Sequence, residues 1–155
     1  MNWSGKIVHM YIAEIGSAPM QLKETLRLIS GVGVEGDRYA TGKGHYSHNP
    51  SKDRQVTLIE IEALEAIRRD YGLTLEPKET RRNITTQGVP LNHLVDKSFR
   101  IGDVILKGIR LNVPCKYLEE ITGKSVYGPL VHRSGLNCEI LKTGIVRCGD
   151  LITPL

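Results

Sequence analysis

The sequence predicts a mainly β domain with peripheral helices, folded as a closed or partly open β-barrel. Many short apolar and β-branched runs are separated by glycine, asparagine or proline, which is typical of strands joined by turns. Only one long stretch has the periodicity of an amphipathic helix. The 155 residues contain no linker and no low-complexity tract. Residues 1–155 are therefore expected to form a single domain.

The expected strands follow one another along almost the whole chain. Each combines branched or aromatic residues with partial alternation, and turn-forming residues bound it. In chain order they cover residues 6–12, 20–29, 54–59, 82–86, 97–101, 104–113, 136–141 and 145–152. Two similar hexapeptides contain Gly-Asp pairs at 102–103 and 149–150. Each pair is expected to turn a strand.

One longer helix is expected near residues 60–71. Its apolar positions share one helical face, and Gly72 is suited to the C-terminal cap. These apolar positions are Ile61, Leu64, Ile67 and Tyr71. Short helices are expected near 91–94 and 115–122.

The stretch from residue 39 to 53 is polar and rich in glycine and histidine, which predicts a loop. His45 and His48 lie three residues apart there, without a third ligand nearby. We interpret them as surface residues or lid contacts rather than metal ligands.

Composition narrows the classes of function. The net charge is +4, but aromatic residues make up only 5% and basic residues alternate with acidic ones. The composition therefore does not favour nucleic acid as a partner, whereas an anionic small molecule fits if the cations converge in space. The three cysteines form no CxxC pair, and we find neither a signal peptide nor a membrane-spanning run. A cytoplasmic protein without a membrane partner is expected; the sequence does not indicate its oligomeric state.

Cys115 is the most informative single residue. It stands in a Pro-Cys-Lys run where a strand-like stretch gives way to a helical pattern. A thiol in the first turn of a helix and beside an ammonium group is expected to have a lowered pKa, which suits sulfur chemistry or metal ligation. The alternative is a small buried apolar residue, the usual state of free cysteine. Cys138 and Cys148, within strand-like runs, fit that alternative better.

Three further segments carry candidate site residues. Asp37 and Arg38 follow a glycine-rich turn and could border a ligand, or could form only a surface ion pair. Arg82 and Asn83 open a strand, where alternation predicts that Arg81 and Arg82 face opposite sides. One inward arginine would clamp a phosphate or carboxylate; a solvated strand end is the alternative.

The third segment contains His132 and Arg133 in a donor-rich loop before a strand. Imidazole, guanidinium and a glycine-exposed amide suit an oxyanion, and His132 could move protons near neutral pH. A purely structural histidine is the alternative.

Together, in their order, these segments resemble the MOSC family, the domain found at the C-terminus of molybdenum cofactor sulfurases and as small stand-alone proteins. The resemblance spans residues 6 to 152. Its motifs are Gly-Val-Glu-Gly-Asp-Arg at 33–38, Arg-Gln-Val-Thr-Leu at 54–58, Arg-Arg-Asn-Ile at 81–84, Gly-Val-Pro-Leu-Asn-His-Leu at 88–94, Phe-Arg-Ile-Gly-Asp at 99–103, Pro-Cys-Lys-Tyr-Leu at 114–118, His-Arg-Ser-Gly-Leu at 132–136 and Gly-Asp at 149–150. Ser134 departs from the His-Arg-Gly-Gly form common in the family.

The resemblance implies a MOSC-type barrel that binds the molybdenum cofactor, a molybdopterin. It makes Cys115 the molybdenum ligand or a persulfide sulfur carrier. The residues it implies for phosphate or pterin are Arg82, Asn83, His132 and Arg133, with Asp37 and Arg38 bordering the pocket.

Three functions follow as expectations. The first is sulfur transfer, or cofactor-dependent reduction by an oxidoreductase, with Cys115 as the catalytic thiol. The second is a non-catalytic module that binds or delivers the cofactor. The third and weakest is a basic protein that binds phosphorylated ligands or nucleic acid. No aminotransferase-like desulfurase portion is visible, so a cysteine desulfurase or a molybdoenzyme is expected as partner.

Overall fold

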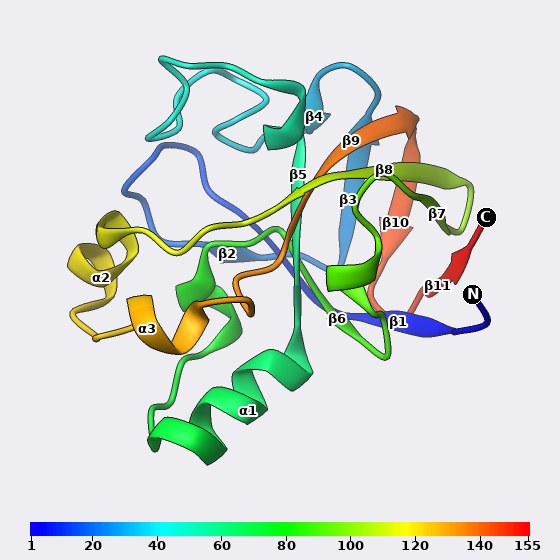
Figure 1. Cartoon of the computed structure of the whole chain (residues 1–155). Coiled ribbons are helices and arrows are strands. Elements are labelled where there is room, and N and C mark those ends of the chain that lie inside the picture. The colour runs from blue at the N-terminus through cyan, green and yellow to red at the C-terminus, as the bar shows by residue number, and fades with distance from the viewer.

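The chain folds around a closed barrel of seven strands, which the computed structural model describes over all residues 1–155 (Figure 1). The strands are β1 (Gly5–Ile12), β5 (Val56–Glu60), β6 (Ile84–Gln87), β7 (Ser98–Ile101), β8 (Val104–Leu111), β9 (Leu136–Lys142) and β11 (Leu151–Pro154). The ring runs β11-β7-β8-β9-β5-β6-β1, and β1 pairs back with β11. Only β5 and β6 are parallel. The mainly β, closed-barrel prediction is confirmed.

Four further strands lie outside the barrel ring. β2 (Gln21–Leu22) pairs with β1, while β3 (Thr25–Ile29), β4 (Gly33–Val34) and β10 (Gly144–Arg147) form a separate sheet in the order β10-β3-β4. The strands expected at 20–29 and 145–152 are thus each two strands. In the second case the chain turns at Gly149, whose φ of 87° lies in the left-handed region. Both predicted Gly-Asp turns are present.

Alternating apolar residues of the ring strands fill the barrel. Phe99, Leu58 and Leu106 are fully buried there, each contributing about 1.5–3 kcal/mol through removal from water. The cluster contains 21 buried residues drawn from segments along the whole chain. Closure of the barrel therefore brings segments distant in sequence to the same rim.

Helices cover one side of the barrel, opposite the two termini (Figure 1). They are α1 (Ile61–Tyr71), α2 (Lys116–Thr122) and α3 (Tyr127–Leu130). The 3₁₀ turns Lys52–Arg54, Pro77–Thr80 and Leu91–His93 lie elsewhere along the chain. A second apolar cluster, which includes Leu64, Ile67, Leu118 and Leu130, joins α1, α2 and α3. Cys115 packs against its edge.

The predicted helices occur where expected, with two differences. The one near 91–94 is a single 3₁₀ turn. Tyr71, expected on the buried face of α1, is 59% exposed because it is the last residue of the helix. Gly72 follows in the left-handed conformation and donates its N–H to the carbonyl of Arg68, as the cap prediction required. None of the helices is both long and apolar enough to span a bilayer.

Candidate functional site

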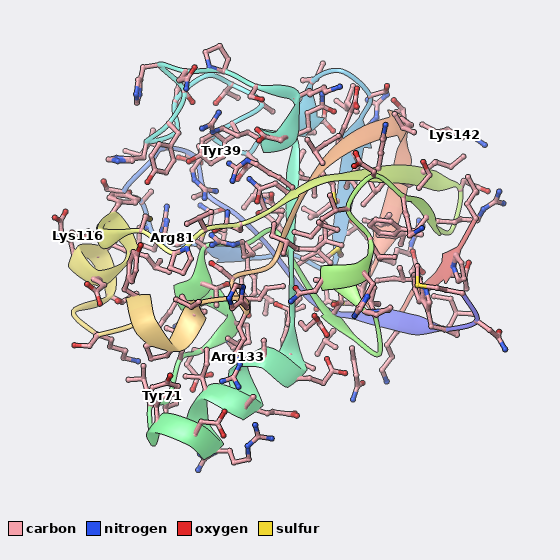
Figure 2. All side chains as sticks on the ribbon, in the orientation of Figure 1. Tyr39, Tyr71, Arg81, Lys116, Arg133 and Lys142 are labelled. Carbon is pink, nitrogen blue, oxygen red and sulfur yellow. The ribbon has the colours of Figure 1, made fainter.

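A cavity of about 320 Å³ lies between the 39–53 loop, the start of α2 and the segment before β6. Five arginines line it, together with three tyrosines and one thiol. The lining residues are Arg38, Tyr39, Tyr46, Arg54, Thr57, Arg81, Arg82, Arg110, Asn112, Val113, Pro114, Cys115, Tyr117, Leu118 and Asn137. No carboxylate is among them. Figure 2 shows Arg81 between Tyr39 and the helix that carries Lys116.

Cys115 is half-buried and lines this cavity. Its backbone is extended, with φ −136° and ψ 155°, so it is the N-cap of α2, one residue before the first turn in which we expected it. The other two thiols lie elsewhere. Cys138 is buried within β9, where burial raises its pKa, and Cys148 donates to the carbonyl of Val8 at 3.4 Å. Cys115 alone presents sulfur to the cavity.

Arg81 and Arg82 both line the cavity, which corrects the expectation that they face opposite sides. Strand alternation does not apply to them, because β6 begins only at Ile84 and Arg81 has a φ of 63°. The Arg81 guanidinium donates to the carbonyl oxygens of Gly16 at 2.6 Å and Ala18 at 2.8 Å.

The Arg82 guanidinium is bound only to neutral acceptors. It donates to the Ser134 carbonyl at 2.9 Å, the Ser134 hydroxyl at 3.0 Å, the Thr80 carbonyl at 3.0 Å and the Asn112 side-chain oxygen. Burial lowers the pKa of Arg82 to about 10, despite the favourable charge of Cys115. A desolvated cation without a carboxylate partner is a strong site for an anion.

The remaining arginines are only partly neutralised. Arg38 forms a 2.9 Å ion pair with Asp37, while Arg54 and Arg110 share the single carboxylate of Asp53. Burial favours the neutral form of Asp53, but hydrogen bonds from Arg110 and Ser51, with the charges of Arg110 and Arg54, lower its pKa overall. Two carboxylates thus lie behind five guanidinium groups, and the cavity carries an excess of positive charge.

Asp37, expected to border the pocket, and Asn83, expected to contact phosphate or pterin, are not among the residues that line the cavity; their side chains lie behind it. The Asp37 carboxylate accepts the backbone N–H of Ala13 at 3.1 Å and the Arg38 guanidinium at 2.9 Å. Asn83 accepts the N–H of Thr57 at 3.1 Å, and its own amide donates to a carbonyl on β1. Both side chains are buried, and these bonds use their polar atoms.

His132 and Arg133, expected to contact phosphate or pterin, are also not among the residues that line the cavity. Arg133 donates to the carboxylate of Asp70 at 2.7 Å. Figure 2 shows it beside α1, away from Tyr39 and Arg81. His132 is exposed because its φ of 62° turns the chain at this point. The loop contributes to the site through Ser134, which follows them.

Ser134, the departure from the family motif, carries no backbone strain, because the left-handed residues around it are His132 and Gly135. Its hydroxyl donates to the Asn112 side-chain oxygen at 3.0 Å and accepts from Arg82. Serine therefore adds a polar contact that orients Arg82.

Sequence reasoning missed the tyrosines and two of the arginines. Tyr46 lies in the 39–53 loop, and Tyr117 lies two residues after Cys115, in the first turn of α2. Arg54 and Arg110 stand in or beside strand-like runs, where the sequence pattern favours a solvent-facing role. The Lys-Tyr pair at 116–117, directly after Cys115, was the only available signal.

Fold and cavity define a class: a small β-barrel protein with one thiol in an arginine-rich pocket. The chain belongs to the MOSC domain family, whose family model matches residues 45–153. This family is associated with sulfurase-type proteins of the molybdenum cofactor. No curated protein matches the chain in sequence.

Several solved structures share the fold. The YuaD protein of Bacillus subtilis is 22% identical with a TM-score of 0.81, and the match covers 97% of this chain and 96% of that one. YiiM of Geobacillus stearothermophilus is 12% identical with a TM-score of 0.75, covering 97% of this chain and 75% of that one. YiiM of Escherichia coli is 16% identical with a TM-score of 0.68, covering 100% and 70%. At these identities the likeness concerns the fold.

Proposed function

We propose that the protein binds the molybdenum cofactor in the arginine-lined cavity and that Cys115 provides the sulfur that meets it. One observation carries the proposal: a single thiol opens into a cavity whose wall has five guanidinium groups and no carboxylate. Such a wall repels cations and attracts a phosphorylated ligand. A phosphorylated ligand does not by itself require a thiol, so the sulfur of Cys115 is an additional donor in the cavity.

The residues present fit the chemistry of this cofactor. Guanidinium groups bind phosphate through paired hydrogen bonds, and Arg81 and Arg82 both line the cavity with only neutral hydrogen-bond partners. Thiolate is a suitable ligand for a metal that prefers soft donors. Three tyrosines provide flat surfaces for a heterocyclic ring. The cavity volume of about 320 Å³ falls within the range for small-molecule sites.

When bound, the cofactor supplies a redox-active metal together with its own sulfur ligands. The chain supplies position and charge. Arg82, fixed by Ser134 and Asn112, requires no reorganisation to receive an anion. Cys115, at the N-cap of α2, lines the same cavity together with Tyr46 and Leu118.

Two modes of action use this pocket. In the first, Cys115 ligates molybdenum or carries sulfane sulfur, which makes the protein an oxidoreductase or a sulfurtransferase-like enzyme. In the second, the protein does no chemistry and only holds the cofactor or delivers it to a molybdoenzyme; a cysteine desulfurase as sulfur donor belongs to the first mode. The position of Cys115 in the cavity wall favours the first mode, since delivery alone needs no thiol there.

The test is native mass spectrometry with metal analysis on protein from cells that make the cofactor. We expect the wild type to retain a molybdenum-containing pterin. Arg82→Gln should lose most of it, whereas Arg133→Gln, the same change outside the cavity, should keep it. Cys115→Ser should lose molybdenum or, for sulfur carriage, the mass gain of one sulfur on Cys115.

Two results would change the conclusion. A wild type without pterin, or equal loading in Arg82→Gln, refutes cofactor binding in this cavity. Full loading and unchanged reductase and sulfur-transfer activity in Cys115→Ser, with loss only in Arg82→Gln, assigns the delivery role instead. Thermal unfolding of each variant confirms that it is folded.

A further inference from the structure

Three residues that line the cavity form one row across the outer face of the barrel wall. β9 lies between β5 and β8 in the ring (Figure 1). Asn137 of β9 pairs directly with Thr57 of β5 and with Arg110 of β8. Residues paired across antiparallel strands point to the same face, with Cβ atoms about 4.5–5.5 Å apart. Because the chain neighbours Leu58 and Cys138 belong to the barrel core, this row faces outward into the cavity.

A β-bulge in β8 directs Arg110 to this face. Gly108 is buried opposite Cys138, whereas Arg110 is opposite Asn137, so two steps along β8 match one step along β9. Ile109 is therefore the extra residue. Without it, strict alternation would turn Arg110 toward the barrel interior, the face that Gly108 presents. The bulge thus places a cation in the cavity that regular pairing would have directed into the core.

Arg110 keeps part of its guanidinium free for a ligand. Its Nε donates to the Asp53 carboxylate, and its Nη1 lies 3.5 Å from the Leu111 carbonyl oxygen. Its Nη2 has no hydrogen-bond partner in the chain. Asp53 does not line the cavity, and its carboxylate also faces the Arg54 guanidinium at 3.9 Å. Since one carboxylate serves two cations, this part of the cavity keeps a positive charge.

A chain of hydrogen bonds fixes the direction of the Asn137 side chain. The Arg82 guanidinium and the Ser134 hydroxyl both donate to the side-chain oxygen of Asn112. The amide nitrogen of Asn112 therefore points the other way, and it donates to the side-chain oxygen of Asn137 at 2.9 Å. Because this bond uses the oxygen of Asn137, its NH₂ group is the part of the amide left for a ligand.

The NH₂ group of Asn137 is an unpartnered donor in a buried residue. Asn137 is only 3% exposed and lines the cavity, and no acceptor in the chain takes a hydrogen bond from its NH₂ group. Leaving such a donor unsatisfied is unfavourable. Arg110, its direct neighbour on β8, adds a second free donor that is charged. An oxyanion has acceptors for both, and hydrogen bonds to ionised groups are the stronger ones.

We propose that Arg110 and Asn137 form a second oxyanion subsite of the cavity, in addition to the guanidinium groups of Arg81 and Arg82. Arg110 supplies the charge, and Asn137 supplies a neutral donor of fixed direction. The ligand is a phosphate or carboxylate group. It belongs either to the cofactor or to a second anionic molecule beside it. That assignment rests on the proposed function, whereas binding of the anion does not.

The test is a titration of cofactor-free, ¹⁵N-labelled protein with inorganic phosphate at neutral pH, followed by NMR of the side-chain amides. Ionic strength is held constant with sodium chloride. The NH₂ signals of Asn137 should shift and saturate. The internal control is the amide of Asn83, which lies behind the cavity and donates to the Tyr11 carbonyl at 3.2 Å. Its signals should stay in place.

Charge at the subsite is tested with Arg110→Gln. The dissociation constant fitted to the Asn137 signals should rise about 10- to 100-fold, as expected for the loss of a hydrogen bond between charged groups. Arg133→Gln, the same change outside the cavity, should leave it unchanged. Asn137 signals that do not move with phosphate overturn the proposal, and the wild type alone gives this result if a variant fails to fold. An equal constant in Arg110→Gln also overturns it.

The two sources of the anion are distinguished by repeating the titration on protein loaded with the molybdenum cofactor. If the cofactor provides the anion, the Asn137 signals are shifted before phosphate is added. If a second molecule provides it, they shift only on addition. Loaded protein whose Asn137 signals respond to neither refutes the subsite and leaves the proposed function standing. A phosphate response in a protein that never retains cofactor refutes only the proposed function.

Discussion

Replacing Gly135 by alanine should destabilise the protein and disturb the arginine pocket from behind. Gly135 follows Ser134 and has a φ of 97°, which L side chains rarely adopt. A Cβ atom there would lie 2.1 Å from the carbonyl oxygen of Leu58. Leu58 pairs with Leu136 in the β5–β9 ladder, so the clash falls on two strands of the barrel.

The expected magnitude follows from two costs. A left-handed backbone costs a residue with a side chain about 1–2 kcal/mol. An overlap of this depth with backbone must be relieved by shifting a strand, and overpacking of that kind costs about 1–3 kcal/mol. We therefore expect a loss of about 3 kcal/mol. For a domain of this size that lowers Tm by about 6–12 °C.

Thermal unfolding by circular dichroism measures the loss, with Gly128→Ala as control. Gly128 lies in α3, and a Cβ atom there would meet nothing within 4 Å. That variant should be neutral or more stable by about 0.5–1 kcal/mol. Gly135→Ala should also retain less cofactor, because the Ser134 carbonyl holds Arg82. A Gly135→Ala protein as stable as the control would refute the reasoning.

Two further predictions concern charge. Burial and the charge of Glu62 raise the pKa of Glu60 from 4.5 to about 7, so stability from this group is present below about pH 4.5 and is lost as pH rises through 7. In urea titrations, the free energy of unfolding of Glu60→Gln relative to that of the wild type should rise by about 1–2 kcal/mol between pH 5 and 8. This is less than the full pKa shift implies, because the carboxyl is partly exposed. A difference in stability that does not change with pH contradicts the prediction. Pyrophosphate should raise Tm of the wild type, by an amount equivalent to about 2.7 kcal/mol at a hundredfold excess over its Kd. The rise should shrink in high salt and in Arg82→Gln but persist in Arg133→Gln, and equal shifts in all three proteins would count against an anion site at Arg82.

The parts of the fold that were predicted depend on local chemistry. The Gly-Asp turns, the Gly72 cap and the start of a helix beside Cys115 each follow from a few adjacent residues. The division of residues 20–29 into β2 and β3 was not predictable in this way. Both halves have strand-like composition, and only their different partners, β1 and β10, separate them.

The residues that line the cavity were predicted only in part, because local sequence does not give the direction of a side chain. Arg38, Arg82 and Cys115 line the cavity, whereas Asp37, Asn83, His132 and Arg133 do not. A motif indicates which residues occur together in the chain, but it contains no information on which way each side chain points. Tyr46 was missed because its loop has no periodicity.

By itself, the sequence determined a mainly β domain with one distinctive thiol at the start of a short helix, because such features need only neighbouring residues. The tertiary structure decided which charges surround that thiol. Closure of the barrel brings Arg38, Arg82 and Arg110 from separate segments to one cavity, whereas Arg133 donates a hydrogen bond to Asp70 outside it. Convergence in space depends on strand order and loop conformation, which are properties of the whole chain.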